Sequence, residues 1–399
     1  MMLYTRYLFL MELEQLFTLE NMNNAFYKCA KISHWKESTQ RYQANLLPNN
    51  IKLQKELLNY TYKVSPTVNF QINERGKIRD IEAPAMRDRI VQKVICREIL
   101  IPQLTPYLIY DNYASLKDRG TSFARKRLDI QLRRYINEYG DDGNVLKVDI
   151  KKFFESIDHT VIKQMLLRKL KGISGDIMNL IFYYIDTSSK TDKGLNLGAE
   201  IPQILAIFYL HEVDNYIKTV RGIKYYGRYM DDIFLISNNK EELKEALEGI
   251  KTQLAKLKLE VNEKKTTITT LHHGFTYMQI KYNVVDGKII KRPTRSKIVR
   301  ERRRLKKYKE LYDRGLMTES EIRNCYLSWR GSLLKDCNAC HKTIASMDKL
   351  YNDLFPIKEV MIKKKRNETI NEAFKEYGMD IRADYYGLED IRFNIIRAN

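Results

Sequence analysis

The chain has 399 residues, 44% of them hydrophobic, which is enough for a sizeable core and excludes a wholly disordered protein. Its 70 Lys and Arg residues outnumber its 50 Asp and Glu residues and give a formal net charge of +20. That excess predicts a polyanionic partner and argues against a protein that acts only on neutral metabolites. No apolar run approaches the roughly 20 residues that span a bilayer, so we expect a cytoplasmic protein with no membrane partner.

Residues 1–66 are predicted to be helical, because apolar residues such as Leu13 and Leu16 follow helical spacing. Alternating apolar residues then predict a β-hairpin with strands at 68–72 and 77–81. The further elements expected along the chain are helices at 86–100, ended by Pro102, and at 122–139, a strand at 144–150, helices through 160–185, a helix from Pro202 to about 220, strands at 224–230 and 233–237, a helix at 240–257, strands within 266–282, and helices from 297 to about 354.

The five cysteines are an odd number and argue against a framework of disulfides. The run Cys337-Asn338-Ala339-Cys340-His341 matches the CxxCH pattern of haem attachment. Covalent haem attachment normally accompanies export, however, and the adjacent Cys340 and His341 cannot easily both reach one tetrahedral metal ion. We therefore expect neither haem nor zinc at this segment.

The most informative feature is a set of three aspartates. Asp149 ends a predicted strand, and Asp231 and Asp232 connect the two strands of a predicted hairpin. Carboxylates gathered at neighbouring strand ends repel one another unless a divalent cation compensates them. Two hard cations held roughly 3.5–4 Å apart suit in-line phosphoryl transfer, the chemistry of nucleotide addition. An isolated Asp-Asp pair is more often only a turn, so the surrounding motifs decide between the two interpretations.

The sequence around these aspartates resembles that of reverse transcriptases. Residues 229–232, YMDD, are similar to the YxDD signature of that family, and residues 148–159, VDIKKFFESIDH, are similar to its first aspartate motif. The two motifs occur in the family's order and at its spacing, and the resemblance extends over residues 20–355. It implies an RNA-directed DNA polymerase that uses two Mg²⁺ ions, for which Mn²⁺ can substitute.

The resemblance also implies a role for each matched residue. The catalytic set is Asp149, Asp231 and Asp232, and the metal-binding set adds Ile150; Asp149 and Asp231 would bind the ions directly, while Asp232 would tune the site from beside them. The nucleotide-binding residues implied are Lys77, Arg79, Phe154, Gln203 and Lys265. The finger residues implied to lie along template and primer are Arg87, Arg89, Lys117 and Arg119.

A basic run at residues 288–309 holds twelve basic residues and one acidic residue. Such a density suits a thumb that grips the product duplex through its phosphates, and we assign this role to Arg302, Arg303 and Arg304. The alternative is an ordinary solvated helix face.

The expected fold class is α+β, the right-hand polymerase, with fingers and palm built from an antiparallel sheet packed on helices and with a helical thumb. The division expected along the chain is an N-terminal helical region (1–66), fingers (67–144), the first part of the palm (145–160), finger and palm helices (161–195), the second part of the palm (196–284), the thumb (285–356) and a tail of unassigned role (357–399).

The identity of the incoming sugar depends on Phe154. It lies five residues after Asp149, where DNA-synthesising members of the family carry an aromatic ring whose bulk excludes a ribose 2′-hydroxyl. The sequence therefore favours deoxynucleotides. Phe153 beside it must point elsewhere, and a role for Phe154 in the core alone stays open.

Residues 197–203, LGAEIPQ, depart from the family's usual Pro-Gln-Gly pattern. They are closer to the corresponding segment of diversity-generating retroelements and of some bacterial defence-associated reverse transcriptases, with Pro202 in place of a serine. The leading hypothesis is antiphage defence, in which the enzyme copies a dedicated non-coding RNA. The alternatives are a mutagenic retroelement enzyme with a small basic accessory protein and a catalytically silent RNA-binding relative. The partners expected are an RNA template, a DNA product, dNTPs, and either an accessory protein or a second copy of the chain.

Overall fold

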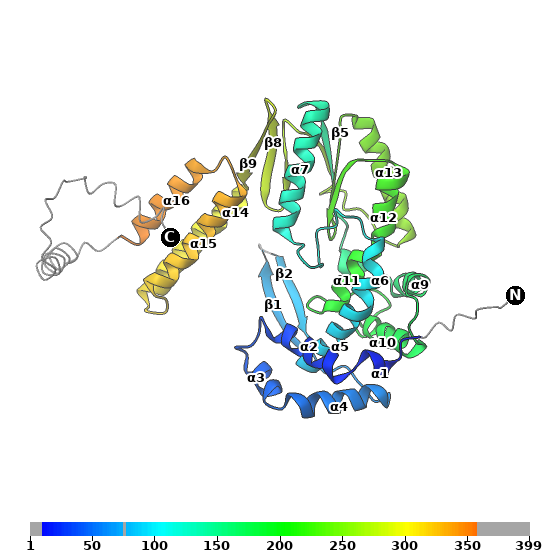
Figure 1. The fold of residues 1–399 in the computed structure, drawn as a ribbon. Coiled ribbons are helices and arrows are strands. Elements are labelled where there is room, and N and C mark those ends of the chain that lie inside the picture. Colours follow the sequence, from blue (N-terminus) through cyan, green and yellow to red (C-terminus); the bar gives the residue numbers. More distant parts are fainter. Residues whose placement is uncertain (1–9, 75–76, 357–399) are drawn as a thin grey trace, which may run out of the picture. The chain divides into compact units, whose positions relative to one another are not determined.

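The structure is a computed structural model that describes residues 10–74 and 77–356 and contains helices and antiparallel sheets (Figure 1). The predicted tail at 357–399 lies outside the described residues. The chain divides into two compact units, made of residues 1–298 with 331–340 and of residues 299–330 with 341–399.

Four helices make up the described part of the N-terminal region, namely α1 (Leu13–Leu16), α2 (Leu19–Ala30), α3 (Glu37–Ala44) and α4 (Leu46–Leu58). The hydroxyl of Thr18 caps α2 by accepting a hydrogen bond of 3.1 Å from the backbone N–H of Asn21. Helix α2 packs against α4 and the following helix α5 (Met86–Ile95), and Phe17 and Phe26 are fully buried there. The apolar spacing in this segment therefore produces a packed helical layer.

The first hairpin forms as predicted, with β1 (Val68–Glu74) antiparallel to β2 (Lys77–Ala83). The helix that follows does not end at Pro102, contrary to the prediction. A π-helical turn (Cys96–Leu100) joins α5 to α6 (Ile101–Leu104), and a short 3₁₀ turn (Thr105–Tyr107) follows. Pro102 is tolerated because it stands in the first turn of α6, where its missing N–H matters least, and the wide π turn absorbs the change of geometry.

A four-stranded antiparallel sheet in the order β4-β5-β3-β6 lies in the first unit. Its strands are β3 (Asn144–Val148), β4 (Tyr225–Tyr229), β5 (Asp232–Ser237) and β6 (Thr267–Thr270). Residues 233–236 of β5 are continuously apolar because both faces of the sheet are covered. Leu235 belongs to the main core together with Ile250 of α13 (Lys240–Lys256), whereas Phe234 alternates to the other face and meets the rings of Tyr113 and Tyr277.

The remaining helices of the first unit are α7 (Thr121–Tyr139), α8 (Phe153–Ser156), α9 (His159–Lys169), α10 (Gly175–Asp186), α11 (Glu200–Tyr209) and α12 (His211–Asn215), with a π turn at Tyr216–Val220. Of these helices, α7 contacts β4 of this sheet, and α10 lies near α1 in the lower part of the picture (Figure 1). Side chains cap two of them: Asp158 accepts from the N–H of Val161 in α9, and Ser174 accepts from that of Ile177 in α10. The helix predicted from Pro202 to 220 is therefore three consecutive helical segments.

A second sheet of three strands consists of β7 (Phe275–Tyr277), β8 (Ile280–Val285) and β9 (Lys288–Pro293). Strand β9 was not predicted, because its basic residues hide the apolar pattern. The Asp286-Gly287 pair before it was a usable sequence signal for a hairpin. Both residues adopt positive φ, 51° and 69°, as a two-residue hairpin turn of this kind requires. Lys291 of β9 forms an ion pair of 2.6 Å with Asp129 of α7.

The described part of the second unit is helical and contains most of α14 (Arg295–Asp313) and α15 (Glu319–Asp336) together with α16 (His341–Leu354). Tyr326 stacks on the rings of Trp329 and Tyr351, and Arg330 pairs with Asp348 at 3.0 Å. Among the residues that the structure describes, no helix is long and apolar enough to cross a membrane.

Candidate active site

The three predicted aspartates lie at one end of the central sheet. Asp149 directly follows β3, and the register pairs Val148 of β3 with Ile233 of β5. Asp231 stands in the turn between β4 and β5, and Asp232 is the first residue of β5. The turn is tight because Met230 adopts the left-handed region with a φ of 53°. Antiparallel pairing therefore places one carboxylate beside a turn that carries the other two.

Burial makes this end of the sheet unfavourable for negative charge. Desolvation, with smaller contributions from the Asp149 and Asp232 carboxylates, raises the pKa of Asp231 to about 6. Desolvation also raises the pKa of Asp232, against the opposing effect of Lys147. The site therefore favours the binding of positive charge next to these carboxylates.

Side chains supply some of that charge. The Lys265 ammonium lies 3.1 and 3.3 Å from the two carboxylate oxygens of Asp149, and Asn262 donates its amide N–H to the same carboxylate at 2.9 Å. Lys147 of β3 lies 3.2 Å from Asp232. Within residues 10–74 and 77–356, no three Asp, Glu, His or Cys side chains converge as a metal-binding group. The Asp149 carboxylate is instead held by Lys265 and Asn262.

A buried ion pair stabilises the β4–β5 turn that carries Asp231. The side chains of Arg228 and Asp214 are both 0% exposed, and the guanidinium donates to the Asp214 carboxylate at 2.8 and 2.6 Å. Its other N–H groups reach the carbonyl of Met230 at 3.1 Å and that of Ile207 at 2.9 Å. The hydroxyl of Tyr226 also donates to Asp214. Arg228 thus links α11, α12 and the turn that carries Asp231.

The two adjacent phenylalanines take different environments. Phe153 is 3% exposed and belongs to the core, whereas Phe154 is half-buried and meets Phe153 edge-on with ring centroids 5.6 Å apart. The carbonyl of Phe154 accepts a hydrogen bond of 2.8 Å from the N–H of Leu195. Of the pair, Phe154 is therefore the ring that can face a ligand.

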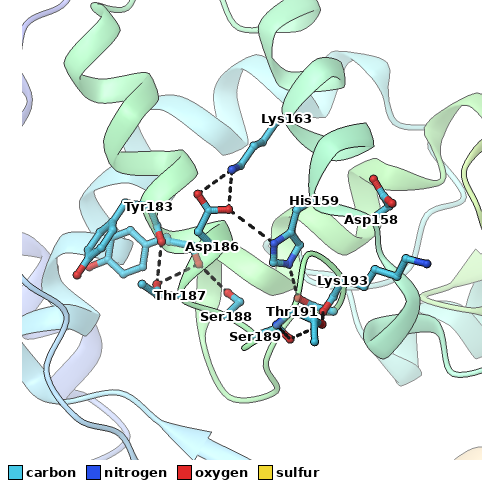
Figure 2. Close-up of polar contacts among 12 residues, drawn as sticks. Asp158, His159, Lys163, Tyr183, Asp186, Thr187, Ser188, Ser189, Thr191 and Lys193 are labelled. Carbon is cyan, nitrogen blue, oxygen red and sulfur yellow. Dashed lines mark hydrogen bonds and ion pairs between the residues drawn. The ribbon is translucent and has the colours of Figure 1, made fainter.

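The loop that contains Leu195 is tied to α9 and α10, as Figure 2 shows. His159 is 4% exposed, and its Nε2 donates to the carbonyl of Gly194 at 2.7 Å. Its Nδ1 lies 3.7 Å from Asp186, which also accepts from Lys163 at 2.5 and 2.7 Å. The backbone N–H of His159 donates to the backbone carbonyl of Asp192 at 3.0 Å. This network fixes the path of the loop toward α11.

Gln203 lies half-buried in the first turns of α11. The side chain of Gln92 in α5 accepts from the N–H groups of Glu200 and Ile201 at 3.0 and 3.4 Å, and so satisfies two free donors at the start of that helix. Just before the helix, Gly198 has a φ of 114°, and a Cβ there would lie 2.7 Å from the carbonyl of Glu82. The start of α11 is thus held close against β2.

For the other predicted nucleotide and metal contacts, the structure gives only burial or position in a strand. Arg79 lies half-buried on β2, opposite Ile72 of β1. The side chain of Lys77 lies outside the described part of the structure. Ile150 is 1% exposed, and since its side chain has no ligand atom, only its backbone carbonyl could serve a metal ion.

Several residues predicted to bind nucleic acid instead contact other groups of the protein. Arg87 pairs with Glu56 and lies over the ring of Tyr62, and Arg89 donates to the carbonyl of Cys29 at 2.9 Å. Arg119 donates to the carbonyl of Tyr110 at 2.7 Å and stacks on two aromatic rings, whereas Lys117 is exposed. In the second unit, α14 exposes all three predicted arginines, Arg302, Arg303 and Arg304.

Sequence reasoning missed three supporting residues. Lys147, Asn262 and Arg228 each contact the aspartates or their turn. A signal existed for Arg228 and Lys147, because a charged residue within an otherwise apolar, buried strand needs a partner. Nothing in the sequence marked Asn262 as a partner of Asp149.

Helices packed with antiparallel sheets, with carboxylates at the end of β3 and at the β4–β5 turn, agree with the α+β right-hand polymerase fold class expected from the sequence. The chain belongs to the reverse transcriptase family: residues 66–287, more than half of it, match the family described as Reverse transcriptase (RNA-dependent DNA polymerase). The matched segment contains all three aspartates.

Individual relatives are more distant. The chain is 24% identical over 289 residues to Protein YkfC of Escherichia coli (strain K12), covering 59% of this chain and 71% of YkfC. It is 24% identical over 240 residues to the group II intron-encoded protein LtrA of Lactococcus lactis subsp. cremoris, covering 55% of this chain but only 37% of LtrA. A solved structure of telomerase from Candida albicans with a fragment of telomeric RNA has a TM-score of 0.44 at 13% identity, covering 78% of this chain and 58% of that chain.

Proposed function

We propose that this chain is an active RNA-directed DNA polymerase, a nucleotidyltransferase that adds deoxynucleotides to a growing DNA strand with two metal ions. The observation that carries the proposal is the gathering of Asp149, Asp231 and Asp232 at one end of the central sheet, with Lys265 beside them. A charged cluster of this kind, partly removed from water, is costly to the fold and is typical of a functional site.

The donor chemistry fits magnesium. Carboxylates and a backbone carbonyl are the hard oxygen ligands that Mg²⁺ prefers. Burial, which raises the pKa of Asp231 and of Asp232, disfavours their charged forms, and a bound cation would stabilise those forms. We assign Asp149, Asp231 and the carbonyl of Ile150 as ligands. Asp232 is engaged with Lys147, which supports a role beside the metal site for this residue.

When bound, two Mg²⁺ ions would activate the attacking 3′-hydroxyl and stabilise the leaving pyrophosphate. The protein groups act around that chemistry. Lys265, which now contacts Asp149, is long and exposed enough to bind the phosphates instead. If Lys265 and Asn262 released the Asp149 carboxylate and bound other partners, that carboxylate would be free to bind a metal ion. Phe154 would lie against the sugar and exclude a ribose 2′-hydroxyl, while Gln203 and Arg79 would contact the incoming nucleotide.

The test is primer extension with an RNA template, dNTPs and Mg²⁺ or Mn²⁺. Asp149→Asn and Asp231→Asn should each abolish incorporation while leaving the unfolding midpoint and RNA affinity close to those of the parent. Asp286→Asn is the matched control, because this exposed aspartate at positive φ lies in the β8–β9 turn and Asn tolerates that conformation. Full incorporation by either active-site variant would contradict the assignment, and a parent enzyme inactive on every supplied and co-purified RNA would favour the silent RNA-binding alternative.

For the biological role we propose antiphage defence, with a dedicated non-coding RNA as template. The support is the departure of residues 197–203 from the family's usual pattern. A mutagenic enzyme of a diversity-generating retroelement is the second candidate, favoured by the same segment. Sequencing of the nucleic acid that co-purifies with the protein separates the two: a single recurrent RNA supports defence, whereas a copy of a variable gene's template repeat supports the retroelement.

A further inference from the structure

A short turn after α2 presents apolar side chains to solvent. Trp35 is 68% exposed, Ile32 is 80% exposed and, one turn earlier, Tyr27 is 59% exposed. A single exposed apolar residue is ordinary, but three large ones within nine residues, including a tryptophan, are typical of an interaction surface. None of these residues belongs to the polymerase site described above.

The turn is firmly held from the inside. The Ser33 side chain is buried, donates to the carbonyl of Cys29 at 3.1 Å and accepts from the hydroxyl of Thr39 at 3.3 Å. Arg89 of α5 donates to the same Cys29 carbonyl at 2.9 Å and to Ser33 Oγ at 3.4 Å. The exposed ring of Trp35 therefore stands on a turn of defined conformation, which lowers the entropy cost of binding a partner.

The charge around the turn is positive. Lys28, Lys31 and Lys36 are all exposed, and none of the three forms an ion pair with any residue that the structure describes. The Lys36 ammonium lies 5.5 Å from the centre of the Trp35 ring. The only acidic residue between 27 and 43 is Glu37, which pairs with Arg41. The surface can thus attract anions and offers an aromatic face in the same place.

Aromatic rings interleaved with free lysines match the chemistry of an unpaired nucleic-acid strand. Every base has a flat face that can stack on an indole ring, and the phosphates between bases attract ammonium groups. A duplex would satisfy the lysines but not the ring, because its bases are already stacked. An acidic protein segment would satisfy the charge and the apolar groups, but it would not need a flat exposed ring.

We propose that the Trp35 surface, formed by Tyr27, Lys28, Lys31, Ile32, Trp35 and Lys36, binds an unpaired segment of RNA, with a base stacked on Trp35 and phosphates against the lysines. The choice of RNA over DNA rests on the proposed polymerase function, which supplies RNA as template. The stacking and the charge contacts do not depend on catalysis.

The indole ring gives a local signal for the test. The chain has two tryptophans, so Trp329→Phe, at a 9% exposed position stacked on Tyr326, leaves Trp35 as the only tryptophan. Full-length Trp329→Phe protein is titrated with a 12-nucleotide oligouridylate, and the Trp35 fluorescence should be quenched as the base stacks. A duplex RNA of the same length should bind through charge without comparable quenching.

Matched variants separate stacking from charge. In the parent chain, Trp35→Ala should weaken oligouridylate binding about tenfold, as expected for one stacked base, while Trp35→Phe should retain most of the affinity. Replacing Lys28, Lys31 and Lys36 with Gln should weaken the salt dependence of binding, so that the negative slope of log affinity against log salt concentration becomes less steep by about 2. The inactive Asp231→Asn variant should still show the quench of Trp35 fluorescence. A failure of the polymerase proposal can therefore be told apart from a failure of the RNA-binding proposal.

Two results would overturn the proposal. One is an unchanged Trp35 fluorescence at oligouridylate concentrations that saturate binding, with Trp35→Ala binding as tightly as the parent. The other is a change of molecular mass in solution on Trp35→Ala with no change in RNA affinity, which would assign the surface to contact between copies of the chain.

Discussion

The buried pair of Arg228 and Asp214 gives the sharpest stability prediction. Arg228→Met removes the guanidinium but keeps a side chain of similar length, so Asp214 is left as a buried carboxylate with only Tyr226 beside it. Loss of one partner from a buried ion pair costs about 3–5 kcal/mol, because the remaining charge is neither hydrated nor compensated. The carbonyls of Met230 and Ile207 also lose their donors. We expect the free energy of unfolding to fall by about that amount.

Urea unfolding followed by circular dichroism measures this change, with an unaltered m-value as the sign that the denatured state is unaffected. The double variant Arg228→Met with Asp214→Leu is the control, since replacing both partners by apolar groups is often close to neutral. The double variant should recover most of the stability but little of the primer extension, because the Met230 carbonyl still lacks its bond. A loss below about 1 kcal/mol in the single variant, or full activity in the double variant, would refute the reasoning.

Three further outcomes are expected. Phe154→Val should admit ribonucleotides and shift the ratio of ribo- to deoxynucleotide incorporation by roughly 10- to 200-fold, the range that one group in a tight pocket produces; unchanged sugar selection in primer extension would contradict the role of the ring. Charge reversal of Arg302, Arg303 and Arg304 should weaken RNA binding and flatten its salt dependence, and an unaltered slope would mean that these side chains are only solvated. Burial opposes the ionisation of Asp158, but its bonds to Lys258 and to the Val161 N–H lower its pKa below the ordinary value of about 3.8. Its contribution to stability is therefore complete above that value and is lost as the pH falls through the lower, folded-state pKa, so Asp158→Asn should unfold less pH-dependently than the parent in acid.

The parts of the fold that the sequence predicted well are those with local signals. The continuous apolar run of β5 beside Asp231 and Asp232 indicated a buried hairpin, and the strand before Asp149 ended where a carboxylate replaced apolar residues. Elements failed where a local rule was overridden. Pro102 suggested a helix end, but the preceding π turn allows the helix to continue.

The candidate site was predicted as a set of residues but not as a set of contacts. In the sequence, Arg87 and Arg89 cannot be told apart from basic residues that contact a template. In the structure, Arg87 pairs with Glu56, and Arg89 donates to a carbonyl at the turn after α2. Pairings such as Lys147 with Asp232 join different strands through the register of the sheet. A single sequence contains no direct record of that register, so these partners become visible only in three dimensions.

The hydrogen bond from Leu195 to the Phe154 carbonyl has a consequence for how this chain can change over time. It ties the residue proposed to select the sugar to the loop that leads into Gln203, and His159 fixes the same loop one residue earlier. Substitutions at Phe154 and in residues 197–203 should therefore have non-additive effects on nucleotide choice. Lineages that alter one would be under pressure to alter the other, so the two segments proposed to contact the nucleotide would evolve together in this chain.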